Sequence, residues 1–272
     1  MANPLRLVLV RHGESEANTV QNAQKRGEVS PIEDALSTRA DWKQRLSPKG
    51  REQARIAGKK LREIYGDLEF FDAHYVSPFI RTRETAVLIS GQKQVKWRID
   101  DRLSERIWGI YGAVSRAEQR SHFPLTAKLA NDDPWYIRYD GGESLFDVYN
   151  RFKAFQSKLW RENSRQNVLI VAHKQLIQTA CYDIEKLLPE DWDKIWENKK
   201  YDIPNCGAVE FSRVNPLDSR DIRENFSWRR FLDLGGGKIP SEFQNWEEIG
   251  GDKAFLTDEL SSQIINYRPF MD

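Results

Sequence analysis

Apolar runs alternate with amphipathic segments from the N-terminus to about residue 214. Leu5 to Val10 predicts a strand buried on both faces, because leucines and valines follow one another there. Residues 46–65 predict a helix that starts at Ser47 and Pro48. Its apolar positions recur at three- and four-residue steps, at Ala54, Ala57, Leu61 and Ile64. The next expected elements are a strand within 70–79, a helix at 80–90, a long helix within 142–163, a strand and helix within 166–184, and a last strand at 207–214.

This alternation predicts an α/β fold: a three-layer α/β/α sandwich with a mostly parallel central sheet. We assign this domain to residues 1–214. Beyond Val214 the pattern fades into a segment rich in glycine, proline and aromatic residues, among them Trp228, Phe231, Phe243 and Trp246. Residues 215–272 are too aromatic for a free linker, so we expect this extension to pack on the domain or on a partner.

The charge balance excludes some partners. The 272 residues include 42 Lys and Arg and 41 Asp and Glu, a net charge of +1, so no global field draws the chain to nucleic acid or to a membrane. No apolar signal region or membrane-spanning stretch is visible, and we expect a soluble, cytoplasmic protein. Cys181 and Cys206 are too few for a disulfide framework or a zinc site, so we expect reduced, core-filling thiols.

Charged and polar residues stand where three predicted strands end. Arg11 and His12 follow the first strand, and His173 follows the strand within 166–184. Ser77 ends another strand and leads into the helix that carries Arg81. Ligands of open α/β sheets bind beyond the carboxyl ends of the strands. Because arginines and histidines clustered without a carboxylate partner repel one another, this edge predicts an anion pocket.

Six motifs in order along the chain resemble those of the histidine phosphatase superfamily, which includes the cofactor-dependent phosphoglycerate mutases. They are RHGES (11–15), LSPKGREQA (46–54), SPFIRTRETA (77–86), LSERIWGIYG (103–112), GGES (141–144) and VAHK (171–174). The resemblance implies a phosphoglycerate mutase-like fold and the activity of a phosphatase on a small phosphorylated substrate.

The resemblance also implies roles for the matching residues. His12 would be the nucleophile that takes the phosphoryl group. Arg11 and Arg81 would hold the phosphoryl oxygens, and His173 would add a further donor. Glu105 would be the general acid, which requires a raised pKa if it is to be protonated near neutral pH. A neutral imidazole can attack phosphorus while fixed arginines stabilise the developing charge, so we expect neither metal nor cofactor.

Three further residues are candidates for binding substrate. Asn18 matches a position that helps to orient phosphate in the family, and Ser15 is a weaker candidate for the same pocket. Lys174 stands where the family usually has glycine. Its side chain either adds charge at the mouth of the site, favouring a substrate with a second anionic group, or points to solvent.

Several departures from the mutases favour hydrolysis over phosphoryl transfer. Mutases resembling this chain usually carry a tyrosine three residues after the glutamate, where this chain has Trp108, and a tryptophan where it has Ala17. They also have an adjacent arginine pair, whereas residues 115–140 hold only scattered basic residues, Arg116, Arg120, Lys128 and Arg138. A phosphoglycerate mutase and a non-catalytic interaction scaffold are the alternative functions.

The charge-dense stretch 24–45 predicts solvated surface, and a lid over the site is the alternative interpretation. The substrate's identity and the oligomeric state are left open by the sequence.

Overall fold

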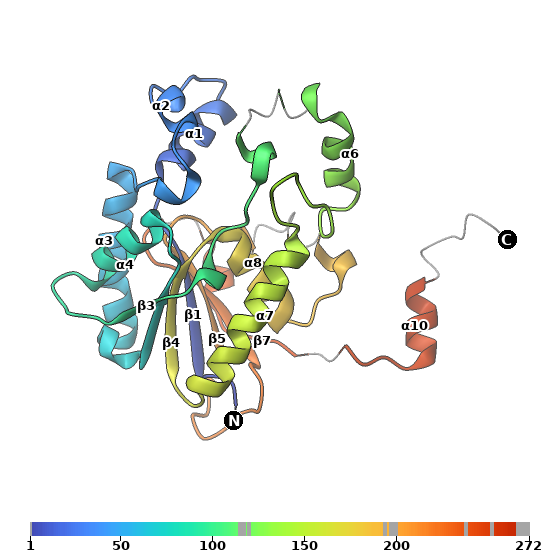
Figure 1. The fold of residues 1–272 in the computed structure, drawn as a ribbon. Helices are drawn as coiled ribbons and strands as arrows, with labels where there is room; N and C mark the ends of the chain where they lie inside the picture. Colours follow the sequence, from blue (N-terminus) through green and yellow to red (C-terminus); the bar gives the residue numbers. More distant parts are fainter. Residues whose placement is uncertain are drawn as a thin grey trace.

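A seven-stranded sheet forms the centre of the molecule (Figure 1). The computed structural model describes residues 2–113, 118, 121–192, 195, 201–236, 239–250 and 253–264. The strands are β1 (Arg6–Arg11), β2 (Ala73–Val76), β3 (Trp97–Ile99), β4 (Asn167–Ala172), β5 (Gly207–Ser212), β6 (Trp228–Asp233) and β7 (Glu247–Glu248), in the order β3-β2-β4-β1-β5-β6-β7.

The sheet has a parallel half and an antiparallel half. Strands β3, β2, β4 and β1 are parallel, with Arg6 of β1 opposite Asn167 and Arg11 opposite Ala172 of β4. From β1 onward the pairs β1–β5, β5–β6 and β6–β7 are antiparallel. The sheet is therefore mixed, and its parallel half carries the strand ends that the sequence singled out.

Helices cover both faces of this sheet, which confirms the three-layer α/β architecture (Figure 1). One face packs on α3 and α4, and the other on α7 and α8. The helices are α1 (Glu16–Lys25), α2 (Glu33–Ser37), α3 (Pro48–Tyr65), α4 (Ile80–Ser90), α6 (Pro124–Asp132), α7 (Leu145–Glu162), α8 (Lys174–Ile184) and α10 (Thr257–Ile264).

The first strand shows why its sequence is continuously apolar. Leu7 and Leu9 point into the core beneath α7 and α8, while Val8 and Val10 point into the core beneath α3 and α4. All four side chains are fully buried. Since alternate side chains of a strand point to opposite faces, a strand covered on both sides needs apolar residues at every position.

Helix α3 begins where the sequence places it. Ser47 caps the helix by accepting a hydrogen bond from the Gly50 amide at 3.0 Å, and Pro48 occupies its first turn. Three of the four predicted core positions are fully buried, but the fourth was wrong, since Ile64 is 42% exposed. Ile64 is the last residue but one of α3, and its side chain lies partly on the solvent side of the helix.

The expectation that 207–214 is the last strand was wrong, because β6 pairs with β5 and β7 pairs with β6. The sequence of β6, WRRFLD, does not read as a buried strand because it contains two adjacent arginines. Arg229 is buried in β6, where Glu185 and Glu247 neutralise its charge. Trp228 and Phe231 of the same strand are buried. Helix α10 lies away from this body in Figure 1.

The remaining expectations concern the two cysteines, membrane-spanning helices and the charge-dense stretch 24–45. Cys181 and Cys206 are buried free thiols, as expected. No helix in the described residues is long and apolar enough to cross a bilayer. Residues 24–45 comprise the end of α1, α2, the 3₁₀ helix η1 (Asp41–Lys43) and mostly exposed loops. Arg116 and Arg120 lie outside the described residues.

Candidate active site

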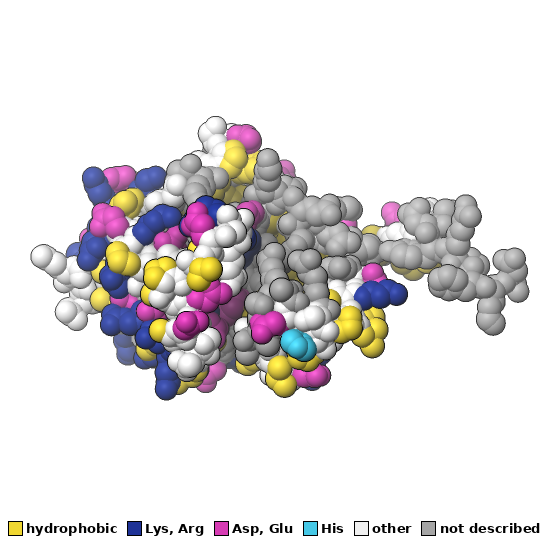
Figure 2. All heavy atoms as spheres, turned by 90° about the horizontal axis from the view of Figure 1, so that it is seen from above, with side chains coloured by type: hydrophobic (Ala, Val, Ile, Leu, Met, Phe, Trp, Pro, Cys, Tyr) yellow, Lys and Arg dark blue, Asp and Glu magenta, His cyan; other side chains and the backbone are white. Residues whose placement is uncertain are grey.

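The predicted functional residues meet above the carboxyl ends of the parallel strands. Arg11 ends β1 and His12 follows it, while His173 follows the neighbouring strand β4. Ser77 follows β2 and leads into α4, which carries Arg81. Seen from above, the described surface at this end shows basic and acidic side chains side by side (Figure 2).

The loop after β1 is held by helices on one side of the sheet. The Gly13 amide donates a hydrogen bond to Thr85 Oγ1 of α4 at 3.1 Å, and the Ser47 amide donates to the Glu14 carbonyl at 2.8 Å. Gly13 and Gly50 let the loop and α3 approach closely, since a Cβ on Gly13 would lie 2.3 Å from the Gly50 oxygen. The LSPKGREQA motif therefore fixes the loop that carries His12.

His12 is held as a neutral imidazole with a defined tautomer. Its Nδ1 lies 2.7 Å from the Gly13 carbonyl oxygen, which can only accept, so Nδ1 carries the ring proton. The lone pair is then on Nε2, which is hydrogen-bonded to no described residue. Burial lowers the His12 pKa well below its usual value, and the charges of Arg81 and Arg11 lower it further. This arrangement provides a nucleophilic nitrogen at neutral pH.

His173 is fully buried beside His12. Its Nε2 lies 2.8 Å from Ser77 Oγ, and its Nδ1 has no hydrogen-bond partner in the described residues. Burial lowers the His173 pKa well below its usual value, with further lowering by Arg81. In the tautomer with the proton on Nδ1, Nε2 accepts from the Ser77 hydroxyl and Nδ1 is a free donor.

The two arginines differ in their partners. Arg11 donates to the Ile203 carbonyl at 2.8 Å, and its buried Nε has no partner in the described part of the chain. Arg81 is 4% exposed and forms an ion pair with Asp41, with Nη1 3.0 Å from Oδ1 and Nη2 3.2 Å from Oδ2. The expectation that the cluster lacks a carboxylate partner was therefore wrong for Arg81, because the chain itself supplies one.

The Glu105 pKa is shifted in the direction that a general acid needs. It lies in the loop after the 3₁₀ helix η3 (Asp101–Leu103), and its Oε1 accepts a hydrogen bond from the Arg106 amide at 3.0 Å. Burial raises the Glu105 pKa, and the negative charge of Asp41 raises it too, against the opposing effects of that amide, Arg81 and Arg11. The charges of both arginines therefore act on this carboxyl group.

The GGES motif supports the Glu105 loop. Glu143 pairs with Arg151 at 2.9 Å, and Arg151 donates to the Glu105 carbonyl at 3.1 Å. The Ile107 amide donates to Glu143 Oε2 at 2.9 Å. Gly109 has a φ of +55°, and a Cβ there would lie 2.0 Å from the Asp140 oxygen, so only glycine fits. The two motifs are thus joined by hydrogen bonds and close packing next to Glu105.

Asn18 and Ser15 lie at the start of α1. Ser15 caps the helix through the Asn18 amide, and Asn18 Oδ1 accepts from the Ser15 amide at 3.2 Å. Asn205, which the sequence did not single out, donates both to Asn18 Oδ1 and to the His12 carbonyl at 3.1 Å. The Ser15 hydroxyl is engaged in the cap, and the predicted contacts of both residues with substrate stay predictions.

Lys174 is neither free nor simply solvated, because it forms an ion pair with Asp202. Asp202 has a pKa below its usual value: its burial opposes the shift, but Lys174 and Arg11 outweigh burial. A second anionic group of a substrate would therefore have to compete with the Asp202 carboxylate for Lys174.

Sequence reasoning missed Asp41, Arg151, Asn205 and Asp202, which stand outside the motif positions used for prediction.

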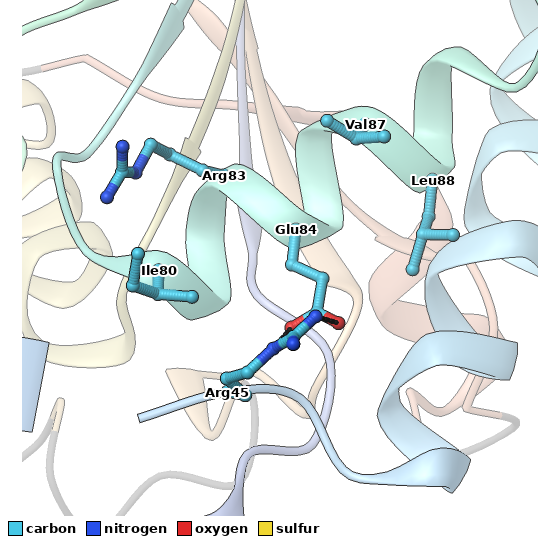
Figure 3. A pocket seen from close by; sticks show the side chains of 6 residues that line it. All are labelled: Arg45, Ile80, Arg83, Glu84, Val87 and Leu88. Atoms are coloured by element: carbon cyan, nitrogen blue, oxygen red, sulfur yellow. Dashed lines mark hydrogen bonds and ion pairs between the residues drawn. The ribbon is translucent and has the colours of Figure 1, made fainter. Parts of the chain in front are cut away.

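No group of three or more His, Cys, Asp or Glu that could hold a metal ion occurs in the described residues. A cavity of about 480 Å³ lies on the outer face of α4, and none of the residues that line it is a predicted catalytic residue. Its lining is Arg45, Ile80, Arg83, Glu84, Val87 and Leu88 (Figure 3).

Comparison with known proteins gives a consistent set of relatives. The family model described as the histidine phosphatase superfamily (branch 1) matches residues 7–207. Phosphoserine phosphatase 1 of Hydrogenobacter thermophilus is 30% identical over 80% of this chain and 90% of its own length. A phosphoglycerate mutase-like protein of Arabidopsis thaliana is 29% identical over 99% of this chain and 95% of its own.

Among solved structures, the mycobacterial glucosyl-3-phosphoglycerate phosphatase superposes with a TM-score of 0.58 at 25% identity. The match covers 85% of this chain and 97% of that structure.

Proposed function

Because this chain belongs to the histidine phosphatase superfamily, we propose that it is a metal-independent phosphatase that hydrolyses phosphomonoesters through a phosphohistidine on His12. The observation that carries the proposal is the His12 tautomer. The Gly13 carbonyl accepts a hydrogen bond from His12 Nδ1–H, and burial keeps the ring neutral, so the Nε2 lone pair is free to attack.

In the first step His12 Nε2 attacks phosphorus, and the bond from phosphorus to the ester oxygen breaks. Arg11 and Arg81 stabilise the charge on the phosphoryl oxygens, and the Nδ1–H of His173 adds a donor. Glu105 gives its proton to the departing oxygen, which leaves as an alcohol.

In the second step water attacks the phosphohistidine. Glu105, now a carboxylate, takes a proton from the water as the phosphorus–nitrogen bond breaks. Inorganic phosphate forms, and the lone pair returns to Nε2. The raised Glu105 pKa supports both roles, since the same group must be an acid in one step and a base in the next.

Hydrolysis fits the contacts of Lys174 and Arg138 better than mutase chemistry does. A mutase must hold a second anionic group of its substrate with additional cations. Here Lys174 is paired with Asp202, and Arg138 is paired with Asp147, so neither cation is free of a carboxylate. The relatives named as phosphatases are consistent with this choice, and small phosphorylated compounds are the expected substrates.

The test is phosphate release from p-nitrophenyl phosphate and from 3-phosphoglycerate in the presence of a chelator. We expect release by the native protein and none by His12→Ala. Conversion of 3-phosphoglycerate to its isomer without phosphate release would instead support the mutase alternative. Loss of release in chelator that returns with added metal would contradict the metal-independent mechanism.

A further inference from the structure

The Asp41 carboxylate is paired with the guanidinium group of Arg81, which binds the phosphoryl group in the proposed mechanism. Arg81 Nη1 donates to Asp41 Oδ1 at 3.0 Å and to the Asp41 carbonyl at 2.8 Å, and Nη2 lies 3.2 Å from Oδ2. Two carboxylate oxygens thus face the two terminal nitrogens of one arginine. Two oxygens of a phosphoryl group present the same spacing and charge to such a fork.

The two partners differ strongly in their exposure. The Arg81 side chain is 5% exposed, whereas that of Asp41 is 51% exposed. A buried guanidinium needs a counter-charge, because removal from water without one is costly. A half-exposed carboxylate can return to water at little cost. The arginine is therefore the fixed member of the pair, and the carboxylate is the exchangeable one.

We propose that the Asp41 carboxylate and the phosphoryl group compete for Arg81, so that Asp41 must swing into water when phosphate or a phosphate ester binds. This inference rests on the proposed function in assigning Arg81 to the phosphoryl oxygens. Arg81 then keeps an anionic partner throughout the cycle: Asp41 in the empty site, and the phosphoryl group in the loaded site. The return of Asp41 helps to expel the product phosphate.

The segment around Asp41 is anchored so that only the side chain needs to move. Before Asp41, Arg39 pairs with Glu16 of α1 at 2.7 Å. After it, Arg45 pairs with Glu84 of α4 at 2.9 Å, a contact marked in Figure 3. The hydrogen bond from Arg81 to the Asp41 carbonyl keeps the backbone in place during the exchange. Rotamer changes of exposed side chains take picoseconds to nanoseconds, so this exchange is no kinetic barrier.

Charge counting gives the direction of the effect. Arg11 and Arg81 together match the two charges of a phosphate dianion. An Asp41 carboxylate left beside Arg81 adds a third negative charge at hydrogen-bond distance from the same donors. Removing that charge should therefore strengthen phosphate binding. If Asp41 instead served to hold Arg81 in its working position, removing the charge would weaken phosphate binding.

The experiment is calorimetric titration of the full chain with inorganic phosphate. We expect Asp41→Asn to bind phosphate about fivefold more tightly than the native protein, since an ion pair with one exposed partner is a modest interaction. Asp41→Glu keeps the charge and should bind within about twofold of native. The matched control is Asp34→Asn in α2, which removes the same charge from an exposed position of the same segment. Unchanged or weaker binding by Asp41→Asn would overturn the proposal.

Steady-state kinetics separate this inference from the proposed function. Competition predicts that Asp41→Asn lowers both KM and the inhibition constant of phosphate by a similar factor. If the native protein has no phosphatase activity but Asp41→Asn binds phosphate more tightly, the competition is supported and the proposed hydrolysis is refuted. An active native protein whose Asp41→Asn variant binds phosphate no more tightly would support the proposed hydrolysis and refute the competition.

Discussion

The imidazole rings of His12 and His173 lie with their centroids 5.2 Å apart and their planes inclined at 63°. They come from the ends of adjacent parallel strands, β1 and β4, so the sheet itself sets their spacing. Two protonated imidazoles could not remain this close to Arg81. Burial lowers both pKa values, with the charge of Arg81 as the next contribution, and both rings are neutral at physiological pH. One ring can therefore act as nucleophile while the other donates a hydrogen bond.

The pH profile of the native protein should reflect these shifts. His12 must be neutral to attack, so activity falls on the acid side only as pH drops through its lowered pKa, below the usual value of about 6.5. Glu105 must be protonated to act as an acid, so kcat/KM falls as pH rises through its raised pKa. Measuring kcat/KM against pH tests both limbs, and an acid limb at or above the usual histidine value would contradict the account.

Replacing Glu105 by glutamine removes the acid and preserves the size of the side chain. We expect kcat for an alkyl phosphate to fall by about 10²–10⁴-fold, and the alkaline limb to disappear. p-Nitrophenyl phosphate has a leaving group that needs no proton, so its first step should be much less affected. Equal losses on both substrates in the phosphorylation step would mean that Glu105 is not the acid.

Substitution of Gly13 by alanine should damage the site through backbone crowding. The new Cβ would lie 2.3 Å from the Gly50 oxygen, and relief requires the loop and α3 to separate. Overpacking of this kind costs about 1–3 kcal/mol, measurable by denaturant unfolding. Gly250→Ala is the control, because a Cβ there meets no described atom within 4 Å. Equal stability of both variants would refute this packing argument.

Glu210 supports the fold rather than the site. This fully buried carboxylate of β5 accepts hydrogen bonds from Arg6 at 3.0 Å, Arg230 at 2.7 Å and Tyr65 at 2.8 Å. Glu210→Gln leaves two arginines without their counter-charge. We expect a loss of about 3 kcal/mol in unfolding free energy, at the low end for buried pairs because both arginines are partly exposed. Urea unfolding measures it, and a loss under about 1 kcal/mol would contradict the assigned role.

The sequence predicted those parts of the fold and site that depend on local pattern. The apolar run before Arg11 identifies β1, and the change from strand to helix at His173 places that residue at the sheet edge. Asp41 could not be predicted, because its segment is charged throughout and only tertiary packing brings one of its carboxylates to Arg81. Strand β6 was missed for a similar reason, since Arg229 is buried by an ion pair that no hydrophobic pattern reveals.

The phosphohistidine on His12 can be trapped by rapid acid-free quenching of the protein during turnover of a ³²P-labelled phosphate ester. A phosphohistidine is labile to acid and stable to alkali. We expect such a label in the native protein and in His122→Ala, whose histidine lies on the exposed surface, and none in His12→Ala. Label of the same stability retained in His12→Ala, or hydrolysis that proceeds at the native rate without His12, would contradict it.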